Sequence, residues 1–268
     1  MTLIYPLAAI DLDGTLLGSD HAISPENACA VREAVRQGMT IVLASGRRWA
    51  TIAAFARKLD LPLNFPIIAY NGAMIRTLGG ETWFHQPVPA DASRAIVHYC
   101  AQHGCHLNFY LNDEFYVRGD TSWGRMYEQR TGTAAHVTGD LTQFDGREPT
   151  KLLLIDTQEI TDRLLKHFGA EFGDMLYITK TEDEYLEFMN PSVSKGVALA
   201  EVARRLGLAA KDCVAFGDSY NDLPMLEWAG LGVAMDNARP ELKFVAGKIA
   251  PAADADGVAA MLLSLLMN

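Results

Sequence analysis

Short apolar runs alternate with amphipathic stretches along the first part of the chain. Amphipathic spacing predicts helices over residues 25–37 and from about 49 to 59. The first of these begins with Ser24 as its N-cap and Pro25 in its first turn, and it ends at Gly38. Strands alternating with helices of this length predict parallel βαβ units. The apolar runs that predict buried strands are residues 3–10, 39–44 and 66–70.

The pattern changes from about Gly80. After a predicted helix over residues 93–103, two apolar runs flank Asn112 and Asp113, which is typical of a hairpin. Further along, strands are expected at residues 151–155 and 175–179, with a helix near 160–168 between them. Strands outnumber crossover helices here, so the sequence predicts an inserted α/β domain with an antiparallel sheet.

The first pattern resumes after Asn190 and Pro191. A helix over residues 195–206 is followed by a strand at 213–216, a helix at 223–228 and a strand at 231–235. The predicted fold is therefore α/β, with a doubly wound, Rossmann-like parallel core sheet and an inserted α/β domain. We assign residues 1–81 and 190–268 to the core and residues 82–189 to the insertion.

Net charge and composition limit the kinds of partner that the protein is expected to bind. The net charge is −10, and hydrophobic residues make up 49% of the chain. An acidic globular protein is not expected to bind nucleic acid, because phosphate backbones need clustered Lys and Arg. A small phosphorylated ligand needs only one local basic site and a metal ion. We expect a monomer or a small homo-oligomer.

The chain ends carry no sign of a membrane segment. The N-terminal apolar stretch has no basic region before it and stops at Asp11, unlike a signal peptide. The apolar run at residues 259–267 is too short to span a bilayer. We therefore expect a cytoplasmic protein without a membrane partner.

The four cysteines suggest no disulfide framework. Cys100, His103, Cys105 and His106 form a cluster that resembles zinc ligands, but their spacing fits no ordinary closed site and a second cysteine pair is missing. The favoured interpretation is the end of an amphipathic helix followed by a strand.

The strongest chemical signal is the pair Asp11 and Asp13 at the end of the first strand. Side chains at i and i+2 of a strand point the same way, and Gly14 then lets the backbone turn. Two like charges at a strand end repel unless a cation or a shared proton compensates them. An Asp-rich turn is the simpler explanation for such a pair taken alone. Open α/β sheets, however, place their active sites at this edge.

Other polar groups follow the remaining core strands. Ser45 and Gly46 offer a hydroxyl and an unhindered N–H before a helix, where anions bind, although an ordinary helix cap would look the same. Lys195 at a helix start opposes the helix dipole, which suggests that it faces a bound anion, although a solvated surface lysine is the simpler explanation for this residue taken alone. Asp218 and Asp222 offer oxygen ligands that suit Mg²⁺, although an ordinary turn residue after Gly217 would look the same as Asp218.

These residues converge at the carboxyl edge of the predicted sheet. Together they supply a nucleophile, an acid, a cation and a metal cage, which favours phosphoryl transfer through an aspartyl-phosphate. Mg²⁺ would neutralise both the nucleophile and the phosphate.

In these motifs the sequence resembles the haloacid dehalogenase (HAD) superfamily, and within it the Cof-type phosphatases with a type-two (C2) cap. Two further stretches, Asn71-Gly-Ala73 and Gly232-Val-Ala-Met-Asp-Asn237, are similar to that subfamily. The resemblance spans the whole core in order. The four main segments are Asp11-Leu-Asp-Gly-Thr15, Ala44-Ser-Gly-Arg47, Ser194-Lys-Gly196 and Gly217-Asp-Ser-Tyr-Asn-Asp222.

The resemblance implies roles for the charged residues. Asp11 would be the nucleophile. Asp13 would protonate the leaving alkoxide, then activate water, and its backbone carbonyl would contact Mg²⁺. Asp11 and Asp218 would ligate Mg²⁺ through their side chains. Lys195 would bridge nucleophile and phosphate, and Asp222 would support Lys195 or a metal-bound water.

It also implies the residues that contact the substrate. Ser45 and the Gly46 amide would hold phosphate oxygens, and Asn221 would contact the phosphate. Arg47 and Asn71, near a crevice between core and insertion, are candidates for substrate contact. The insertion would be a mobile lid. Its aromatic candidates for a pocket, which could equally belong to the insertion's own core, are Tyr110, Tyr116, Trp123 and Tyr185.

The leading functional hypothesis is a Mg²⁺-dependent phosphatase acting on a small phosphorylated metabolite, with sugar phosphates as the favoured class. Pyridoxal phosphate and nucleotide-like monoesters remain open. A phosphomutase or phosphotransferase is an alternative, in which an alcohol replaces water as acceptor. A non-catalytic sugar-phosphate sensor is least favoured, because a sensor has no need of the nucleophile–acid pair.

Overall fold

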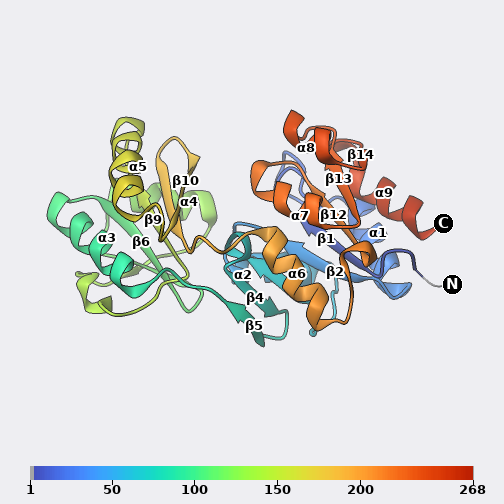
Figure 1. Cartoon of the computed structure of the whole chain (residues 1–268), viewed down its shortest axis with the longest axis horizontal. Helices are drawn as coiled ribbons and strands as arrows, with labels where there is room; N and C mark the ends of the chain where they lie inside the picture. Colours follow the sequence, from blue (N-terminus) through green and yellow to red (C-terminus); the bar gives the residue numbers. More distant parts are fainter. Residues whose placement is uncertain (1–2, 268) are drawn as a thin grey trace. The chain divides into compact units, whose positions relative to one another are not determined.

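The computed structural model describes residues 3–267, which form two compact units. The core unit comprises Met1–His85 and Val193–Asn268, and the insert unit comprises Gln86–Ser192. Figure 1 shows that each unit contains a sheet with helices packed on it. The core unit is thus built from two separate stretches of chain.

An eight-stranded sheet forms the centre of the core unit, in the order β14-β13-β12-β1-β2-β3-β4-β5. The first six strands in this order are parallel, and β4 and β5 continue the sheet as an antiparallel hairpin. A doubly wound parallel core is therefore confirmed. The strands are β1 (Leu7–Asp11), β2 (Thr40–Ala44), β3 (Pro66–Ala69), β4 (Met74–Thr77), β5 (Thr82–His85), β12 (Cys213–Gly217), β13 (Leu231–Met235) and β14 (Lys248–Ala250).

Strand β1 lies at the middle of this sheet, between β2 and β12. All five of its residues are buried, as the continuous apolar run before Asp11 predicts for a strand covered on both faces. It begins at Leu7, later than the predicted residue 3. Pro6, just before it, lends only its carbonyl to the pairing, as acceptor for the N–H of Thr40 at 2.8 Å.

The core helices begin at the residues that the sequence marks as caps. The Ser24 hydroxyl accepts a hydrogen bond from the N–H of Asn27 at the start of α1, and Ser194 does the same for Val197 at the start of α6. The side chain of Asn27 also accepts from the N–H of Ala259, which ties α1 to α9. The core helices are α1 (Pro25–Arg36), α2 (Trp49–Lys58), α6 (Lys195–Arg205), α7 (Leu223–Trp228), α8 (Pro240–Val245) and α9 (Gly257–Leu266).

The insert unit has a six-stranded sheet in the order β10-β11-β9-β6-β7-β8. All its strand pairs are antiparallel except β7 with β8, which confirms the predicted character of the insertion. Helices α3 and α5 bury one face of the sheet in a hydrophobic core. The elements are α3 (Ala90–His103), β6 (His106–Leu111), β7 (Glu114–Val117), α4 (Ser122–Thr131), β8 (His136–Val137), β9 (Lys151–Ile155), α5 (Gln158–Phe172), β10 (Tyr177–Glu182) and β11 (Tyr185–Met189).

The β6–β7 hairpin forms where the sequence predicts it. Asn112 and Asp113 have φ values of 55° and 66°, so both adopt the left-handed conformation that a tight two-residue hairpin requires. The strand expected at residues 175–179 lies instead at β10, because Met175 still belongs to the turn after α5 and its N–H bonds to the carbonyl of Phe172.

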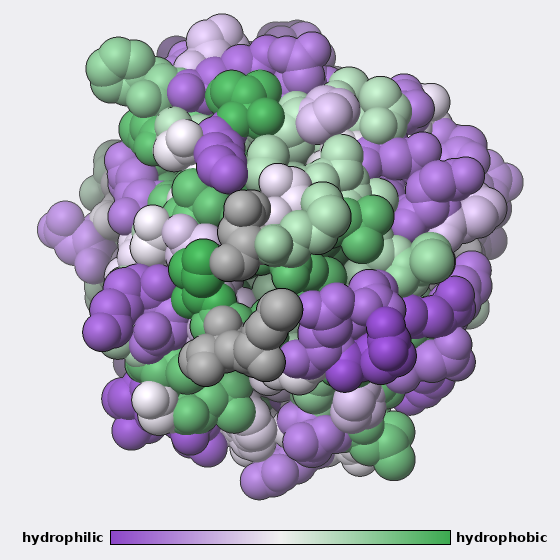
Figure 2. All heavy atoms as spheres, turned by 90° about the vertical axis from the view of Figure 1, so that its right-hand side faces the viewer, coloured by the Kyte–Doolittle hydropathy of each residue, from purple (hydrophilic) through white to green (hydrophobic). Residues whose placement is uncertain are grey.

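The surface is mixed in character. Figure 2 shows hydrophilic and apolar residues interspersed on the face that carries the C-terminal elements. The exposed apolar residues of those elements include Phe244, Ile249 and Leu263. None of the helices within residues 3–267 is both long enough and apolar enough to cross a membrane.

Candidate active site

A buried ion-pair cluster lies at the carboxyl ends of β1 and β12. Lys195 Nζ is 2.5 Å from Asp11 Oδ1 and 2.6 Å from Asp222 Oδ1, and its side chain is 0% exposed. Asp11 is the last residue of β1, Lys195 is the first residue of α6, and Asp222 ends a short turn after β12. Three segments far apart in the sequence thus meet at one ammonium group.

Asp222 is held rigidly by its own loop. Its Oδ2 accepts hydrogen bonds from the N–H groups of Asp218 and Ser219, both at 3.0 Å, while Oδ1 accepts from Lys195. A Cβ at Gly217 would lie 2.4 Å from the Cβ of Asp222, so only glycine fits there. Both carboxylate oxygens of Asp222 are therefore already occupied, which marks it as the residue that positions Lys195.

Asp218 lies beside the β1 loop. The hydroxyl of Thr15 donates to its Oδ1 at 3.0 Å. Gly14 has φ 79°, and a Cβ there would lie 2.5 Å from Asp218 Oδ2. Gly14 thus allows both the turn after β1 and the close approach of this carboxylate. The carbonyl of Gly14 is in turn fixed by the side-chain amide of Asn237 at 2.8 Å.

Negative charge exceeds positive charge in this cluster. Burial raises the pKa of Asp11 well above its usual range, and the neighbouring charge of Asp222 adds to the rise. Burial together with Asp222 also raises the pKa of Asp218 to about 6. Burial by itself would lower the pKa of Lys195, but Asp11 and Asp222 outweigh it and raise that pKa. Three carboxylates thus lie near a single ammonium group, which contacts two of them.

The donor set fits a hard divalent cation. Oxygen atoms of Asp11, Asp218 and Asp222 all lie within 4.8 Å of one another. Asp11 and Asp218 each use Oδ1 for the contacts described above, so the second oxygen of each is the donor that a cation would take. An all-oxygen set with unbalanced negative charge suits Mg²⁺.

Asp13 faces a different partner. Arg47 Nε donates to Asp13 Oδ2 at 2.8 Å, and Arg47 Nη2 donates to Asp13 Oδ1. Hydrogen bonding to Asp13 raises the pKa of Arg47. The side chain of Asp13 is 45% exposed, so unlike Asp11 it is in contact with water. The structure therefore separates a buried carboxylate from a solvent-accessible one at the end of the same strand.

Ser45, Gly46, Asn71 and Asn221 form a second group at this edge of the sheet. The Ser45 hydroxyl accepts from the N–H of Arg47 at 3.2 Å, and the Ser45 carbonyl accepts from the N–H of Asn71 at 3.1 Å. The Asn221 amide donates to Asn71 Oδ1 at 2.9 Å. A Cβ at Gly46 would lie 2.9 Å from the same Oδ1, so the loop after β2 packs tightly on Asn71.

Sequence reasoning missed several contacts that shape the site. The hydroxyl of Thr15 bonds Asp218, a partner that the motif does not predict. Sequence reasoning named the segment containing Asn237 without seeing that this side chain anchors Gly14. The signal was present for Thr15, because it directly follows Gly14 in the same motif, but the partner lies 203 positions away in the chain.

The aromatic candidates of the insert unit have differing surroundings. Tyr110 and Tyr185 are buried, and Tyr110 Oη lies 2.5 Å from Tyr127 Oη. Tyr116 stacks on His136, and Trp123 is half-buried in α4.

A charged pair that the sequence did not single out lies on the sheet face turned away from α3 and α5. Lys151 Nζ is 2.9 Å from Glu187 Oε1 and 5.2 Å from the ring centre of Tyr110. Both members of the pair are buried.

The zinc alternative for the Cys and His cluster finds no support among residues 3–267. The only described group of three or more metal-ligating side chains is the Asp11, Asp218 and Asp222 cluster. His103 packs on the ring of Tyr99, with 4.2 Å between ring centres, and His106 bonds Thr121 and Asn108.

The fold, together with the polar motifs at the ends of its core strands, is typical of one class of hydrolases. Residues 8–262 match the model of the haloacid dehalogenase-like hydrolases, and the chain belongs to that family. The resemblance seen in the sequence motifs is thereby confirmed. The enzyme class is phosphoric monoester hydrolase, since the curated relatives that it matches are phosphatases.

Two curated phosphatases and one solved structure show how similar the chain is to known proteins. A putative phosphatase of Streptococcus pyogenes is 30% identical over 266 residues, which cover 98% of each chain. The 5-amino-6-(5-phospho-D-ribitylamino)uracil phosphatase of Bacillus subtilis is 26% identical over 262 residues, covering 96% of each. A crystal structure of a Thermotoga maritima protein superposes with a TM-score of 0.92 at 31% identity, covering 97% of each.

Proposed function

We propose that this protein hydrolyses small phosphorylated metabolites through a phosphate ester formed on Asp11, with Mg²⁺ as cofactor. The observation that carries the proposal is the Lys195 ammonium, fully buried and shared by Asp11 and Asp222. The buried ammonium opposes the rise that burial causes in the pKa of Asp11, and it draws an anionic substrate towards that carboxylate.

In the first half of the reaction, an Asp11 oxygen attacks phosphorus and the bond from phosphorus to the ester oxygen breaks. Asp13, in its protonated form, gives its proton to the departing alkoxide. The solvent access of Asp13 lets a water molecule reach it for the second half of the reaction. In the second half, Asp13 accepts a proton from water, which attacks the phosphorylated Asp11 and releases inorganic phosphate.

The Arg47–Asp13 pair has a consequence for this cycle. While both hydrogen bonds from Arg47 are made, both oxygens of Asp13 accept from the guanidinium and neither is available to a substrate. We infer that Arg47 turns to the substrate when an anion binds, which releases Asp13 for protonation. Arg47 would then link substrate binding to the acid step.

Phosphate oxygens would be held by the Ser45 hydroxyl, the Gly46 N–H, Asn221 and Lys195. Asn71 holds Asn221 in place and is a candidate for substrate contact. The side chains of Asp11 and Asp218, with the backbone carbonyl of Asp13, would hold Mg²⁺. When bound, Mg²⁺ offsets the repulsion between Asp11 and the phosphate dianion.

The substrate class is part of the proposal. The Bacillus subtilis relative is named for a phosphorylated ribitylamino compound, which supports a small phosphorylated metabolite as substrate. Sugar phosphates remain the favoured class. We propose that residues 82–189 act as the substrate-selecting lid, and that the polar sheet face bearing Lys151 and Glu187 takes part in that selection.

The test is a panel of phosphorylated metabolites assayed with Mg²⁺ for released phosphate, with Asp11→Asn protein as the matched control. Release from at least one sugar phosphate, absent in the variant, supports the proposal. Measuring without an added alcohol acceptor separates hydrolysis from phosphotransfer. Phosphate released equally by the variant would contradict it.

A further inference from the structure

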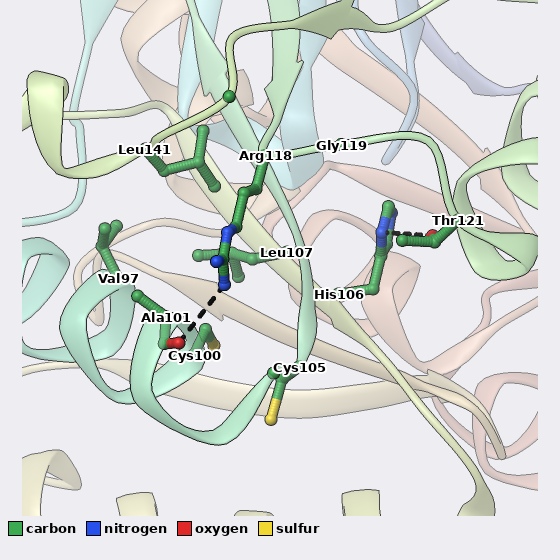
Figure 3. Close-up of a pocket in the computed structure, with 12 residues that line it drawn as sticks. Val97, Cys100, Ala101, Cys105, His106, Leu107, Arg118, Gly119, Thr121 and Leu141 are labelled. Carbon is green, nitrogen blue, oxygen red and sulfur yellow. Dashed lines mark hydrogen bonds between the residues drawn. The ribbon is translucent and has the colours of Figure 1, made fainter.

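The insert unit contains a cavity of about 290 Å³ at the C-terminal end of α3 (Figure 3). Cys100 from the last turns of α3 and Cys105 from the loop before β6 both line it. Arg118, which follows β7, lines it as well. All of these residues belong to the insert unit, whereas the candidate catalytic residues belong to the core unit. The cavity is therefore not part of the candidate active site.

The turn between the two cysteines holds them close together. Gly104 adopts the left-handed conformation with φ 70°, and the N–H groups of Gly104 and Cys105 both bond to the carbonyl of Cys100. In a helix end of this kind, a side chain in the last turn of the helix packs against the side chain that follows the left-handed residue. Here these two side chains are Cys100 and Cys105. The 3.1 Å bond between Cys105 N and Cys100 O folds the chain back at this point, so that the two residues are neighbours in space as well as in sequence.

The thiols of Cys100 and Cys105 differ in pKa and in exposure. A side-chain hydrogen bond from Cys100 lowers the pKa of Cys105, and the same contact, with burial, raises the pKa of Cys100. Of the nearby charges, Arg163 favours the Cys105 thiolate and Asp156 opposes it. Cys105 is half-buried and is the more accessible of the two to a reagent, whereas Cys100 is only 3% exposed.

Arg118 favours a negatively charged ligand in this cavity. One of its Nη atoms donates to the carbonyl of Ala101 at 3.3 Å, which fixes the guanidinium beside the end of α3. The residue is exposed, and a guanidinium carries five N–H donors, so the others can reach a small anion in the cavity. A carboxylate matches this planar fork through two parallel hydrogen bonds.

We propose that Cys105 and Cys100 form a thiol–disulfide exchange site for a low-molecular-weight disulfide that carries carboxylates. The Cys105 thiolate attacks one sulfur of the small disulfide, which breaks its S–S bond and releases one small thiolate. Cys100 then attacks the Cys105 sulfur, loses its proton to water, and releases the second small thiolate. The protein gains one disulfide, and the small disulfide is reduced to two thiols.

The remaining cysteines provide controls. Burial raises the pKa of Cys213 to about 11, which leaves it as an unreactive thiol. Cys29 is exposed on α1 and would react on its own, so the experiment uses Cys29→Ser protein as background. Trypsin cleaves after Arg94 and Arg118, so Cys100 and Cys105 stay in one peptide.

The test treats this background protein with oxidised glutathione and counts thiols after denaturation, with mass analysis of the tryptic peptide. Of the three remaining thiols we expect two to be lost, and the peptide to lose the mass of two hydrogens. Adding Cys100→Ser should trap one glutathionyl group on Cys105, whereas adding Cys105→Ser should leave Cys100 unmodified. Retention of all three thiols, or equal modification of the two single variants, would overturn the proposal.

The charge preference is tested by comparing oxidised glutathione with cystamine, a disulfide that carries amines instead of carboxylates. Arg118→Gln should slow the reaction with oxidised glutathione by about tenfold, and leave the reaction with cystamine unchanged or faster. Equal slowing with both disulfides would show that Arg118 only supports the fold of this region, and the assignment of a carboxylate-bearing partner would be wrong.

Discussion

The guanidinium of Arg47 binds the carboxylate of Asp13 through two hydrogen bonds, from Nε and from Nη2. The pair joins the loop after β2 to the loop after β1, and both partners keep access to solvent. In the proposed mechanism this contact occupies both oxygens of the general acid until a substrate anion competes for Arg47. The two residues therefore connect substrate binding to proton transfer.

Arg47→Gln should impair the enzyme without unfolding it. The free energy of unfolding should change by less than about 1 kcal/mol, because ion pairs with this much solvent exposure contribute little. The KM for the best metabolite should rise about tenfold or more, since a charged contact to the substrate is lost. Steady-state kinetics and urea denaturation of both proteins check this. An unchanged KM would remove Arg47 from the substrate site.

Lys195→Met should strongly destabilise the protein. Removing the ammonium leaves Asp11 and Asp222 buried without a counter-charge, which costs about 3–5 kcal/mol in comparable buried pairs. Lys248→Met, at an exposed position on β14, is the matched control and should change stability by less than about 0.5 kcal/mol. Equal denaturation midpoints for the two variants would contradict the account of this cluster.

The pH dependence of stability in metal-free protein should report Asp218. Its pKa rises from 3.8 to about 6 on folding, so the folded state holds this proton more tightly than the unfolded state. The contribution of Asp218 is therefore fully present below about pH 4 and is lost as the pH rises to about 6. Asp218→Asn should reduce the fall in the free energy of unfolding over this pH range. A steeper fall in the variant would show that folding does not raise the pKa of Asp218.

Metal removal should silence the enzyme, and Mg²⁺ should restore it. Without a cation, the carboxylates of Asp11 and Asp218 repel a phosphate dianion. Ca²⁺ should restore less than about a tenth of the rate, because its longer and looser coordination misplaces nucleophile and phosphate. Activity is measured after exhaustive EDTA treatment, with residual metal checked by elemental analysis. Full activity without metal would exclude the cofactor assignment.

The strands and helices that carry strong local signals were the most predictable part of the molecule. The apolar run before Asp11 and the cap at Ser24 are local signals, and the structure has β1 and α1 there. The β4–β5 hairpin was missed because its outer strand is exposed or half-buried throughout and lacks an apolar run. Helix α4 was missed as well, because Gly124 is its only buried residue and its sequence has no apolar stripe.

Within the site, residue types were predictable but partners were not. A carboxylate pair on one strand predicts that both side chains share an environment, yet Asp11 is buried against Lys195 and Asp13 is half-exposed against Arg47. The difference arises from segments that come together only in the folded chain. Lys195 reaches Asp11 from 184 positions away, which no local pattern specifies.

The phosphorylation of Asp11 is the central claim, and a rapid-mixing experiment on Asp13→Asn protein tests it most directly. With p-nitrophenyl phosphate the leaving group needs no acid, so this variant should release one p-nitrophenolate per molecule in a burst and then stall. Acid quenching and peptide mapping should place the phosphate on Asp11, and Asp11→Asn should show neither burst nor label. Steady turnover without a burst, or phosphate on any other residue, would contradict the account.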